Sequence, residues 1–470
     1  MDWLLELTWE RQACFGLWPP MLPDGSAIAA KAAGPARELL AAPDLAAHEA
    51  ALADLESLSL KYVLAAFARL GIALLPGGTL HAGQLASQLG VLPSQRRLFD
   101  RLFSILAEAG ILASAEGESW SVTQTPEASD PERARQNLMD RHGDLLAPEL
   151  ALLGRCGAGL DAALRGAEEA LNLLFPGGDV SDATRLYNDT PRARALNGVV
   201  RQTLQTALGC LPPGRGLRIL EIGGGTGGTT ATLLPALPAD RVRYTFTDIG
   251  ALFVSRARER FADYDFFEAR SPDIGLDPLA QGFSAHSFDL VLAVNVLHAT
   301  PDMPTTMGHV RSLLAPGGLL VLSESTKSSW WCDLIFGLTR EWWCFSDARR
   351  QHPLLTVAAW NDLLSRSGFH GPTCVPDASP AAANQGQVVL VARADDGVTP
   401  RDGRWLILAE ASSASRQDVG EGSLANALVA SLHRRGQDAF VLIADDVADP
   451  AALEDRLRDG PWHGWSTCAP

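Results

Sequence analysis

A glycine-rich turn, "LEIGGGTGGTT" at residues 220–230, directly follows an apolar run and offers bare backbone to a ligand. The glycines at 223, 225 and 228 fit the pattern G-x-G-x-x-G, and Asp248 follows twenty residues after the last of them. In a nucleotide-binding turn of this kind, backbone amides approach the ligand, a helix N-terminus follows, and the later acid binds a ribose. The spacing therefore predicts a nucleoside site, although a turn that only joins a strand to a helix can have the same glycines.

Glu221 narrows the choice of ligand, because it starts the pattern E-x-G-x-G-x-G that runs through Gly223 and Gly225 to Gly227. A carboxylate at this place would repel a pyrophosphate, but it can accept hydrogen bonds from a cationic ligand. S-adenosylmethionine carries a sulfonium and an ammonium group and no phosphate, so it suits this turn better than NAD does. Asp248 would then accept hydrogen bonds from both ribose hydroxyls, with a helix N-cap as its alternative role.

Further polar residues follow the later apolar runs. Asn295 and His298 end the run "SFDLVLAVNVLHAT", and Glu324 ends the run "LLAPGGLLVLSES". Ligands of an open parallel sheet bind outside the carboxyl ends of its strands, so we expect these three side chains beside the ligand. Asp273 in "ARSPDIG" is a candidate partner for the adenine amino group, with a solvated loop acid as the alternative.

The elements that must position these residues form an α/β domain. Five β-rich apolar runs alternate with helical stretches, namely "GLRILEI", "VRYTFTDI", "FDLVLAVNVL", "GGLLVLSES" and "QVVLVARA". This alternation predicts βαβ units and a mostly parallel sheet. Upstream of them, apolar residues recur at helical spacing. We expect four regions: a short N-terminal segment at 1–20, a helical region at 21–185, the α/β core at 186–395 and the beginning of a second βαβ unit at 396–470.

Within the helical region, "HAGQLASQLGVLPSQRRLFDRLFSILAEAGIL" followed by "SWSVT" predicts a winged-helix-like unit, a small helix pair closed by a strand. We expect this unit to serve packing or dimerisation, because the acidic charge around it disfavours DNA.

The composition argues against several classes of partner. With 55 acidic against 39 basic residues, the net charge is −16, which repels nucleic acid and anionic membranes. No apolar stretch reaches the roughly 18 residues that a membrane span needs, and the N-terminus lacks the basic region of a signal peptide. The seven cysteines show no metal-ligand spacing. We therefore expect free thiols, no metal and a cytoplasmic protein.

The sequence resembles the S-adenosylmethionine-dependent C-methyltransferase domains embedded in polyketide synthases. The resemblance covers roughly residues 1–395, and its most specific segments are "NVLHAT" and "WWCFSDARRQHPLL". It implies a class I Rossmann-like methyltransferase fold with a mostly helical N-terminal lid. It also implies methyl transfer to the α-carbon of a β-ketoacyl phosphopantetheine thioester on acyl carrier protein, with S-adenosylhomocysteine as the product of the cofactor.

The resemblance further implies roles for single residues. His298 matches the general base of the family, and Glu324 matches the carboxylate that orients the imidazole ring. Tyr187 matches a tyrosine at the mouth of the pocket that orients the β-keto group. We expect Trp342 and Trp343 to form part of a lid over the acyl chain, although a tryptophan pair is more often core than pocket.

Both ends of the chain resemble neighbouring parts of a synthase. The tail from "RWLILAE" onward resembles the start of the structural, non-catalytic half of a ketoreductase, and "WLLELTWE" resembles a linker strand from a preceding domain. Neighbouring synthase domains are therefore expected partners. The run "DARRQH" is expected to be a solvated helix face, with contacts of Arg349 and Arg350 to an acidic carrier protein as the alternative.

Three other functions remain open from the sequence. A free-standing O- or N-methyltransferase would share the fold and the cofactor, but it would not need the ketoreductase-like tail. A nicotinamide-dependent oxidoreductase is disfavoured by Glu221 and by the absence of a Tyr-x-x-x-Lys pair. A scaffold that has lost methyl transfer is disfavoured because the glycines, Asp248, His298 and Glu324 are all present.

Overall fold

The computed structural model describes residues 22–115, 119–127, 130–376, 386–395, 404–409, 424–433, 438–443 and 462–468. The chain divides into two compact units, Met1–Asp395 and Asp396–Pro470. The predicted linker strand at residues 1–20 lies outside the described residues.

The larger unit contains a seven-stranded sheet with the strand order β6-β5-β4-β7-β8-β10-β9. The strands are β4 Leu217–Ile222, β5 Val242–Thr247, β6 Phe267–Arg270, β7 Phe288–Val294, β8 Leu314–Ser325, β9 Phe369–Cys374 and β10 Gln387–Ala394. Strand β4 pairs in parallel with β5 and β7, β5 with β6, and β7 with β8, whereas β10 is antiparallel to β8 and β9. The predicted α/β fold with a mostly parallel sheet is confirmed, and all five predicted runs form strands. The sequence did not reveal β6 and β9, because "FEAR" is short and charged and "FHGPTC" contains glycine and proline.

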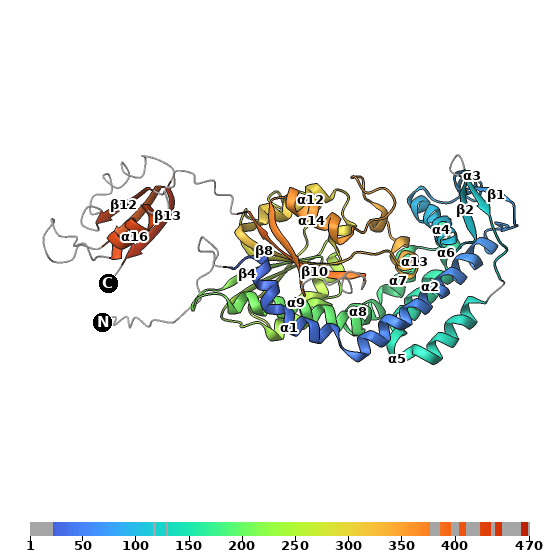
Figure 1. Ribbon diagram of the computed structural model, residues 1–470, viewed down its shortest axis with the longest axis horizontal. Coiled ribbons are helices and arrows are strands. Elements are labelled where there is room, and N and C mark those ends of the chain that lie inside the picture. Colours follow the sequence, from blue (N-terminus) through green and yellow to red (C-terminus); the bar gives the residue numbers. More distant parts are fainter. Residues whose placement is uncertain are drawn as a thin grey trace, which may run out of the picture. The chain divides into compact units, whose positions relative to one another are not determined.

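Helices cover both faces of this sheet (Figure 1). Successive strand residues point to opposite faces, so Leu290 and Leu292 join one hydrophobic cluster while Val291 and Ala293 join the other. The first cluster includes residues of α1 Gly25–Leu40, α9 Pro191–Gly209, α10 Gly228–Leu233 and α11 Ala251–Arg260, and the second includes residues of α12 Met303–Leu313 and α14 Val357–Arg366. Burial on both faces explains why the strands are continuous apolar runs. Helix α1 packs with the sheet although it falls in the predicted range of the lid.

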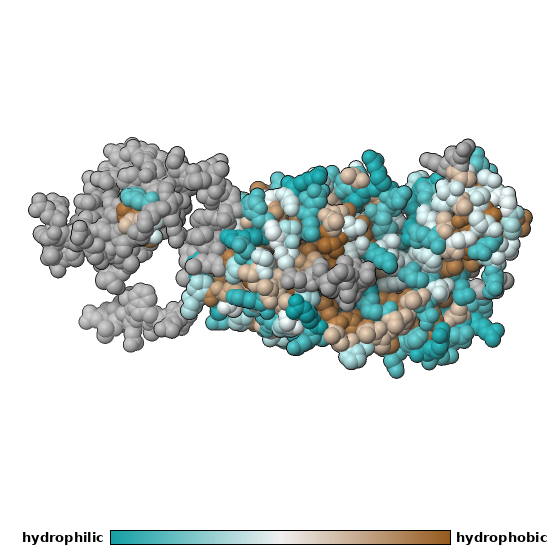
Figure 2. Space-filling view, in the orientation of Figure 1, coloured by the Kyte–Doolittle hydropathy of each residue, from teal (hydrophilic) through white to brown (hydrophobic). Residues whose placement is uncertain are grey.

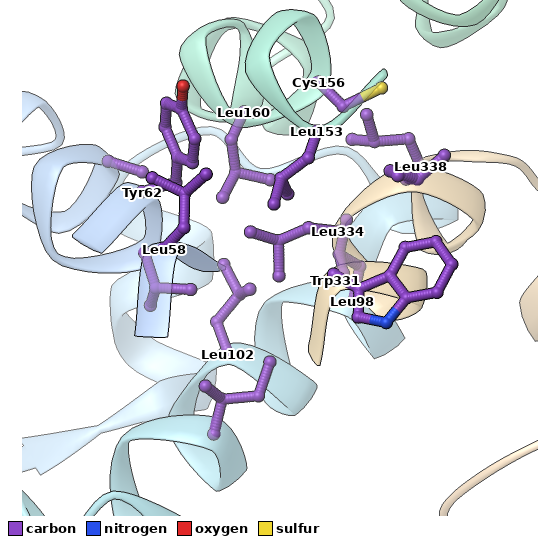
Figure 3. Packing of buried hydrophobic residues seen from close by; sticks show 14 of the residues in the cluster. Leu58, Tyr62, Leu98, Leu102, Leu153, Cys156, Leu160, Trp331, Leu334 and Leu338 are labelled. Atoms are coloured by element: carbon purple, nitrogen blue, oxygen red, sulfur yellow. The ribbon is translucent and has the colours of Figure 1, made fainter. Parts of the chain in front are cut away.

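The lid is helical and is built around two long helices, α2 Pro43–Arg69 and α5 Pro131–Ala158, which pack against each other. The shorter helices of this part are α3 Ala82–Gln88, α4 Arg96–Glu108, α6 Leu160–Leu164, α7 Ala170–Leu174 and α8 Ser181–Asn188. Residues that follow β8 complete its core: Trp331 and Leu334 of α13 Trp330–Ile335 and the nearby Leu338 pack among leucines of the N-terminal helices (Figure 3). The lid thus combines two distant parts of the sequence.

The predicted helix pair closed by a strand is also confirmed. Helices α3 and α4 pack with an antiparallel sheet of the order β1-β3-β2, formed by β1 Thr79–His81, β2 Leu112–Ala115 and β3 Ser119–Val122. Its core includes an aromatic cluster of Phe67, Phe99 and Phe103 with ring centroids 5.1 to 6.3 Å apart. This unit therefore shares the hydrophobic core of the lid.

The smaller unit contains the parallel sheet β12-β11-β13, with β11 Arg404–Ala409, β12 Asp438–Ile443 and β13 Trp462–Cys468. Helix α16 Leu424–His433 lies between β11 and β12 in the chain, so the predicted βαβ unit is confirmed. Its relation to a ketoreductase stays a prediction. Among the described residues, no helix has the length and apolar character to cross a bilayer.

The visible surface of the larger unit is mixed, with hydrophilic residues widespread and hydrophobic residues showing near its centre (Figure 2). One exposed apolar side chain bears on function, because Ile249 is 67% exposed directly after the candidate ribose ligand Asp248.

Candidate active site

The turn after β4 has the backbone geometry that only glycine adopts readily. Gly223, Gly225 and Gly227 have φ angles of 62°, 53° and 74°, and Gly227 immediately precedes α10. An L-residue with a side chain is strained in this left-handed region. The glycines therefore fix the sharp turn from β4 into α10.

The same turn also packs too closely against its neighbours for side chains. A Cβ atom on Gly223 would lie 2.2 Å from Cγ2 of Val296, and one on Gly228 would lie 2.6 Å from the carbonyl oxygen of Tyr187. The turn therefore packs tightly between the loop that follows β7 and helix α8.

Asp248 follows β5 and holds the glycine turn from the side. Its Oδ2 accepts a hydrogen bond from the Gly225 amide at 2.9 Å, and its Oδ1 accepts one from the Gly250 amide at 2.7 Å. Burial raises the pKa of Asp248 against the lowering effect of these two bonds. The N-cap of α11 is Gly250 and not Asp248. Each carboxylate oxygen keeps a second lone pair, so Asp248 can also accept hydrogen bonds from ligand hydroxyls.

The structure brings Gly223, Asp248 and Asp273 to one cavity of about 440 Å³, here named the Asp248 cavity. Oδ1 of Asp273 accepts a hydrogen bond from the Gly275 amide at 2.8 Å, which orders its loop. Apolar side chains that sequence reasoning missed complete the wall, among them Ile249, Phe283 and Val296. The position of Ile249 next to Asp248 was the available signal.

Glu221 points away from this cavity. Residues of β4 alternate between the faces of the sheet, so Leu220 and Ile222 line the Asp248 cavity while Glu221 faces the opposite side. Its Oε2 accepts hydrogen bonds from Thr230 at 2.5 Å and from Tyr244 at 2.8 Å, and burial raises its pKa to about 7. Glu221 thus fixes the first turn of α10, and this geometry does not support a direct contact with the cofactor.

His298 and Glu324 form a buried pair where β7 and β8 end. Nδ1 of His298 lies 2.6 Å from Oε2 of Glu324, and the two residues are 6% and 0% exposed. Oε1 of Glu324 accepts hydrogen bonds from the backbone amides of Val296 and Leu297 at 3.1 and 2.9 Å. A carboxylate fixed in this way holds the Nδ1–H tautomer, which leaves a lone pair on Nε2 for accepting a proton.

His298 lines a second cavity of about 240 Å³ together with Tyr187, Asn295 and Trp342, here named the His298 cavity. Burial, followed by the influence of Cys332 and Glu324, raises the pKa of Tyr187 well above its usual value, so its hydroxyl remains a donor at neutral pH. Asn295 was expected beside the cofactor, but it lines the His298 cavity. Its φ angle is 51°, and its backbone N–H donates to the Ser323 carbonyl at 2.8 Å.

The two tryptophans have different surroundings. The Trp342 ring meets the His298 ring edge-on, with centroids 5.2 Å apart, and stacks on Phe336. Trp343 lines neither cavity: its Nε1 donates to the Gly337 carbonyl at 2.8 Å, and its ring packs in the core of the lid. Of these two tryptophans, Trp342 is therefore placed to contact a ligand, and Trp343 is not.

The expectation that the run "DARRQH" forms a solvated face is wrong for Arg349. Its side chain is 4% exposed and donates to the carbonyl oxygens of His298 and Thr300, each at 2.6 Å. Its Nε also donates to Asp347 at 2.8 Å. Arg349 therefore clamps the loop that carries His298, whereas the neighbouring Arg350 is exposed.

The two cavities adjoin each other, because Ala299 and Glu341 line both. Residues of the lid that carried no sequence signal also line the His298 cavity, notably His48, Glu149 and Trp331. A ligand in the Asp248 cavity would thus lie beside a second ligand next to His298.

Known proteins resemble this chain over most of its length. A family described as "Methyltransferase domain" matches residues 220–320. The solved structure of the CurJ carbon methyltransferase is 42% identical, with a TM-score of 0.77, and the match covers 80% of this chain and 100% of that one. The non-reducing polyketide synthase ausA of Emericella nidulans is 33% identical over 314 residues, which are 66% of this chain and 12% of that protein.

The chain belongs to the carbon methyltransferase domains of polyketide synthases. Its methyl donor is S-adenosylmethionine. The trans-methyltransferase CalH, solved in complex with S-adenosylhomocysteine, is similar to this carbon methyltransferase domain at 26% identity with a TM-score of 0.53, over 73% of this chain and 91% of that one. Among the described residues of the domain, no group of three or more His, Cys, Asp or Glu side chains is arranged to hold a metal ion.

Proposed function

We propose that this domain transfers a methyl group from S-adenosylmethionine to the α-carbon of a β-ketoacyl thioester carried on acyl carrier protein. The observation that carries the proposal is the His298–Glu324 pair, which is buried, fixed by backbone amides and placed on a cavity that adjoins the Asp248 cavity.

The residues of the Asp248 cavity fit the cofactor. Asp248 offers two carboxylate oxygens to the ribose hydroxyls, and Asp273 offers an acceptor to the adenine amino group. Gly223 lines this cavity and carries no side chain, so a ligand can approach its backbone closely. The bound cofactor supplies an electrophilic methyl group on a sulfonium centre. A cavity with two acidic side chains suits a ligand with that positive charge.

His298 acts as the general base in this proposal. The α-carbon of the substrate lies between two carbonyl groups, so its proton is acidic enough for a single imidazole to remove. Glu324 keeps the proton of the neutral ring on Nδ1 and stabilises the imidazolium after Nε2 has accepted the substrate proton. Arg349 holds the backbone of His298 and so contributes to the fixed distance that such a step needs.

Tyr187 is suited to bind the negative charge that forms on the β-keto oxygen. Its hydroxyl remains protonated, and it lines the same cavity as His298. A donor held in place before the reaction stabilises an enolate better than solvent does. Trp342 would hold the acyl group against the His298 ring.

The proposed partners are an acyl carrier protein and the neighbouring domains of a synthase. The CurJ domain, which this chain covers completely, is a carbon methyltransferase, and the matched part of ausA is a small fraction of a polyketide synthase. The parallel βαβ unit at the end of the chain would suit the start of a structural ketoreductase half.

Intact-mass measurement of an acetoacetyl-loaded acyl carrier protein tests the proposal. Incubation with S-adenosylmethionine and the domain should add the mass of one or two methylene groups, and His298→Ala should abolish the gain while keeping the affinity for S-adenosylhomocysteine. Absence of a gain with the wild-type domain, despite measurable binding of the cofactor, would contradict the proposal.

A further inference from the structure

A second histidine–carboxylate pair lies on the wall of the His298 cavity, on the side of the lid. His48 of α2 and Glu149 of α5 both line this cavity. Nε2 of His48 lies 2.9 Å from Oε1 of Glu149, and the side chains are only 2% and 1% exposed. The pair is therefore as deeply buried as His298 and Glu324.

The other polar atom of each side chain is buried and has no partner. Nδ1 of His48 and Oε2 of Glu149 make no hydrogen bond, in contrast to Glu324, whose two oxygens are both occupied. Burying a polar atom without a partner costs free energy, and most such atoms in folded proteins are paired. Glu149 lines the cavity, so its unpaired carboxylate oxygen is a candidate contact for a substrate that enters there.

The chemistry of the pair selects the group that it can bind. The carboxylate Oε2 is a hydrogen-bond acceptor, so its partner must carry an N–H or O–H group. The reacting β-ketoacyl unit offers only carbonyl acceptors. The donor must therefore lie elsewhere on the substrate, as an amide N–H of the pantetheine arm or as a hydroxyl group further along the acyl chain.

We infer that His48 and Glu149 form a substrate-recognition site that binds an N–H or O–H donor of the carried thioester. This inference rests on the proposed function of the domain. Glu149 Oε2 accepts the hydrogen bond of the substrate, while His48 holds Oε1 and so orients the carboxylate. The site gives the lid a direct part in substrate selection, separate from the base on the sheet.

A hydrogen bond that serves only to hold α2 against α5 would give the same distance between His48 and Glu149, so the test must separate this structural role from substrate binding. A second hydrogen bond joins the same two helices: the Tyr62 hydroxyl donates to Oε1 of Glu132 at 2.7 Å. Neither of these residues lines either cavity. Tyr62 belongs to the buried cluster drawn in Figure 3. The variant Tyr62→Phe therefore removes a bond between α2 and α5 without touching the His298 cavity.

The test compares three acetoacetyl-type thioesters with Glu149→Gln, Tyr62→Phe and the unchanged domain. The first is an S-propyl thioester without a donor, the second has an amide N–H in an S-(2-acetamidoethyl) arm, and the third is 5-hydroxy-3-oxohexanoyl S-propyl thioester. Glu149→Gln should lower the ratio of kcat/KM for a donor-bearing to the donor-free substrate about tenfold or more. Tyr62→Phe should leave this ratio unchanged.

A lower ratio for the amide substrate assigns the site to the pantetheine arm, and a lower ratio for the hydroxyl substrate assigns it to the acyl chain. Unchanged ratios for both would overturn the inference. If Glu149→Gln does not fold, the calorimetric affinities of the unchanged domain for the three thioesters decide, and equal affinities would overturn the inference. Calorimetric affinities of the three thioesters in the presence of S-adenosylhomocysteine need no turnover, so they test the site even if the proposed methyl transfer fails.

Discussion

The two cavities differ in how the chain builds them. The Asp248 cavity is formed mostly by the ends of neighbouring strands and the loops that follow them, between residues 220 and 301. The His298 cavity combines the ends of β7 and β8 with side chains of α2, α5, α8, α9 and α13. The first is a local product of the α/β fold, whereas the second exists only when the lid packs on the sheet.

This difference suggests that the Asp248 cavity serves cofactor binding and the His298 cavity serves the methyl acceptor. A cavity made by the sheet can serve any reaction that uses the same cofactor. In the proposed function, the side chains of the lid then select the acceptor. The cavities share only Ala299 and Glu341 in their linings. Substitutions in one cavity should therefore alter cofactor affinity, and substitutions in the other should alter turnover or acceptor selection.

Glu324→Gln should have the largest effect, a loss of turnover of about a thousandfold. The amide oxygen can still accept the two backbone hydrogen bonds, so the amide nitrogen would face Nδ1 of His298. The ring proton would then move to Nε2 and remove the lone pair that accepts the substrate proton. Single-turnover kinetics measure the loss, and calorimetry should find the affinity for S-adenosylhomocysteine unchanged. An equal loss of affinity for S-adenosylhomocysteine would contradict the role of Glu324 as the partner of His298.

Asp248→Ala should weaken cofactor binding about tenfold to a hundredfold, because a buried charged acceptor is lost together with its hold on the glycine turn. Calorimetric titration with S-adenosylhomocysteine measures this change. Asp302→Ala is the matched control, since Asp302 also accepts a backbone hydrogen bond, from Thr305 at 2.8 Å, but lines neither cavity. Equal affinities of Asp248→Ala and the unchanged domain would refute the assignment.

Arg349→Lys should slow turnover about tenfold with little change in cofactor affinity. Arg349 makes these bonds from three separate nitrogens, and the single nitrogen of a lysine cannot take the place of all three, so the base would be less well positioned. The rate is measured with acetoacetyl-N-acetylcysteamine, which needs no carrier protein, and melting temperatures record any loss of stability. Arg350 is exposed, so the control variant Arg350→Ala should have the same rate as the unchanged domain. A similar slowing in both variants would argue against the role of Arg349 in holding the His298 loop.

Glu221→Gln should have the smallest effect on turnover, because Glu221 lines neither cavity, and should act on the pH dependence of stability instead. Burial raises the pKa of Glu221 from 4.5 to about 7, so the folded state binds more protons than the unfolded state between these values. Stability therefore falls as the pH rises through this window, by up to about 3 kcal/mol from this residue. Urea unfolding at pH 5 to 8 should show a flatter profile for the variant. Burial also raises the pKa of Glu56 to about 7, which leaves some slope in the variant. Parallel profiles would contradict the role given to Glu221.

The sequence predicted the parts of the molecule that follow local rules. The glycine turn, the strands and the polar residues at strand ends depend on neighbours in the chain, so periodicity and turn chemistry revealed them. The lining of the lid was not predictable in this way: His48 and Glu149 lie 101 residues apart and meet only through the packing of α2 on α5. For Glu221, the sequence predicted the position beside the glycine turn but not the contacts of the side chain. Those contacts depend on which face of the sheet the side chain points to.

Proton exchange at the α-carbon in deuterated buffer tests the central claim most directly. A β-ketoacyl thioester is incubated with the domain and S-adenosylhomocysteine, so that no methyl transfer can occur, and the initial exchange rate is compared with the rate without protein. The account predicts that the domain accelerates exchange, that His298→Ala abolishes the acceleration, and that Asp248→Ala retains it at saturating S-adenosylhomocysteine. Equal acceleration by His298→Ala and the unchanged domain would contradict the assignment of the base.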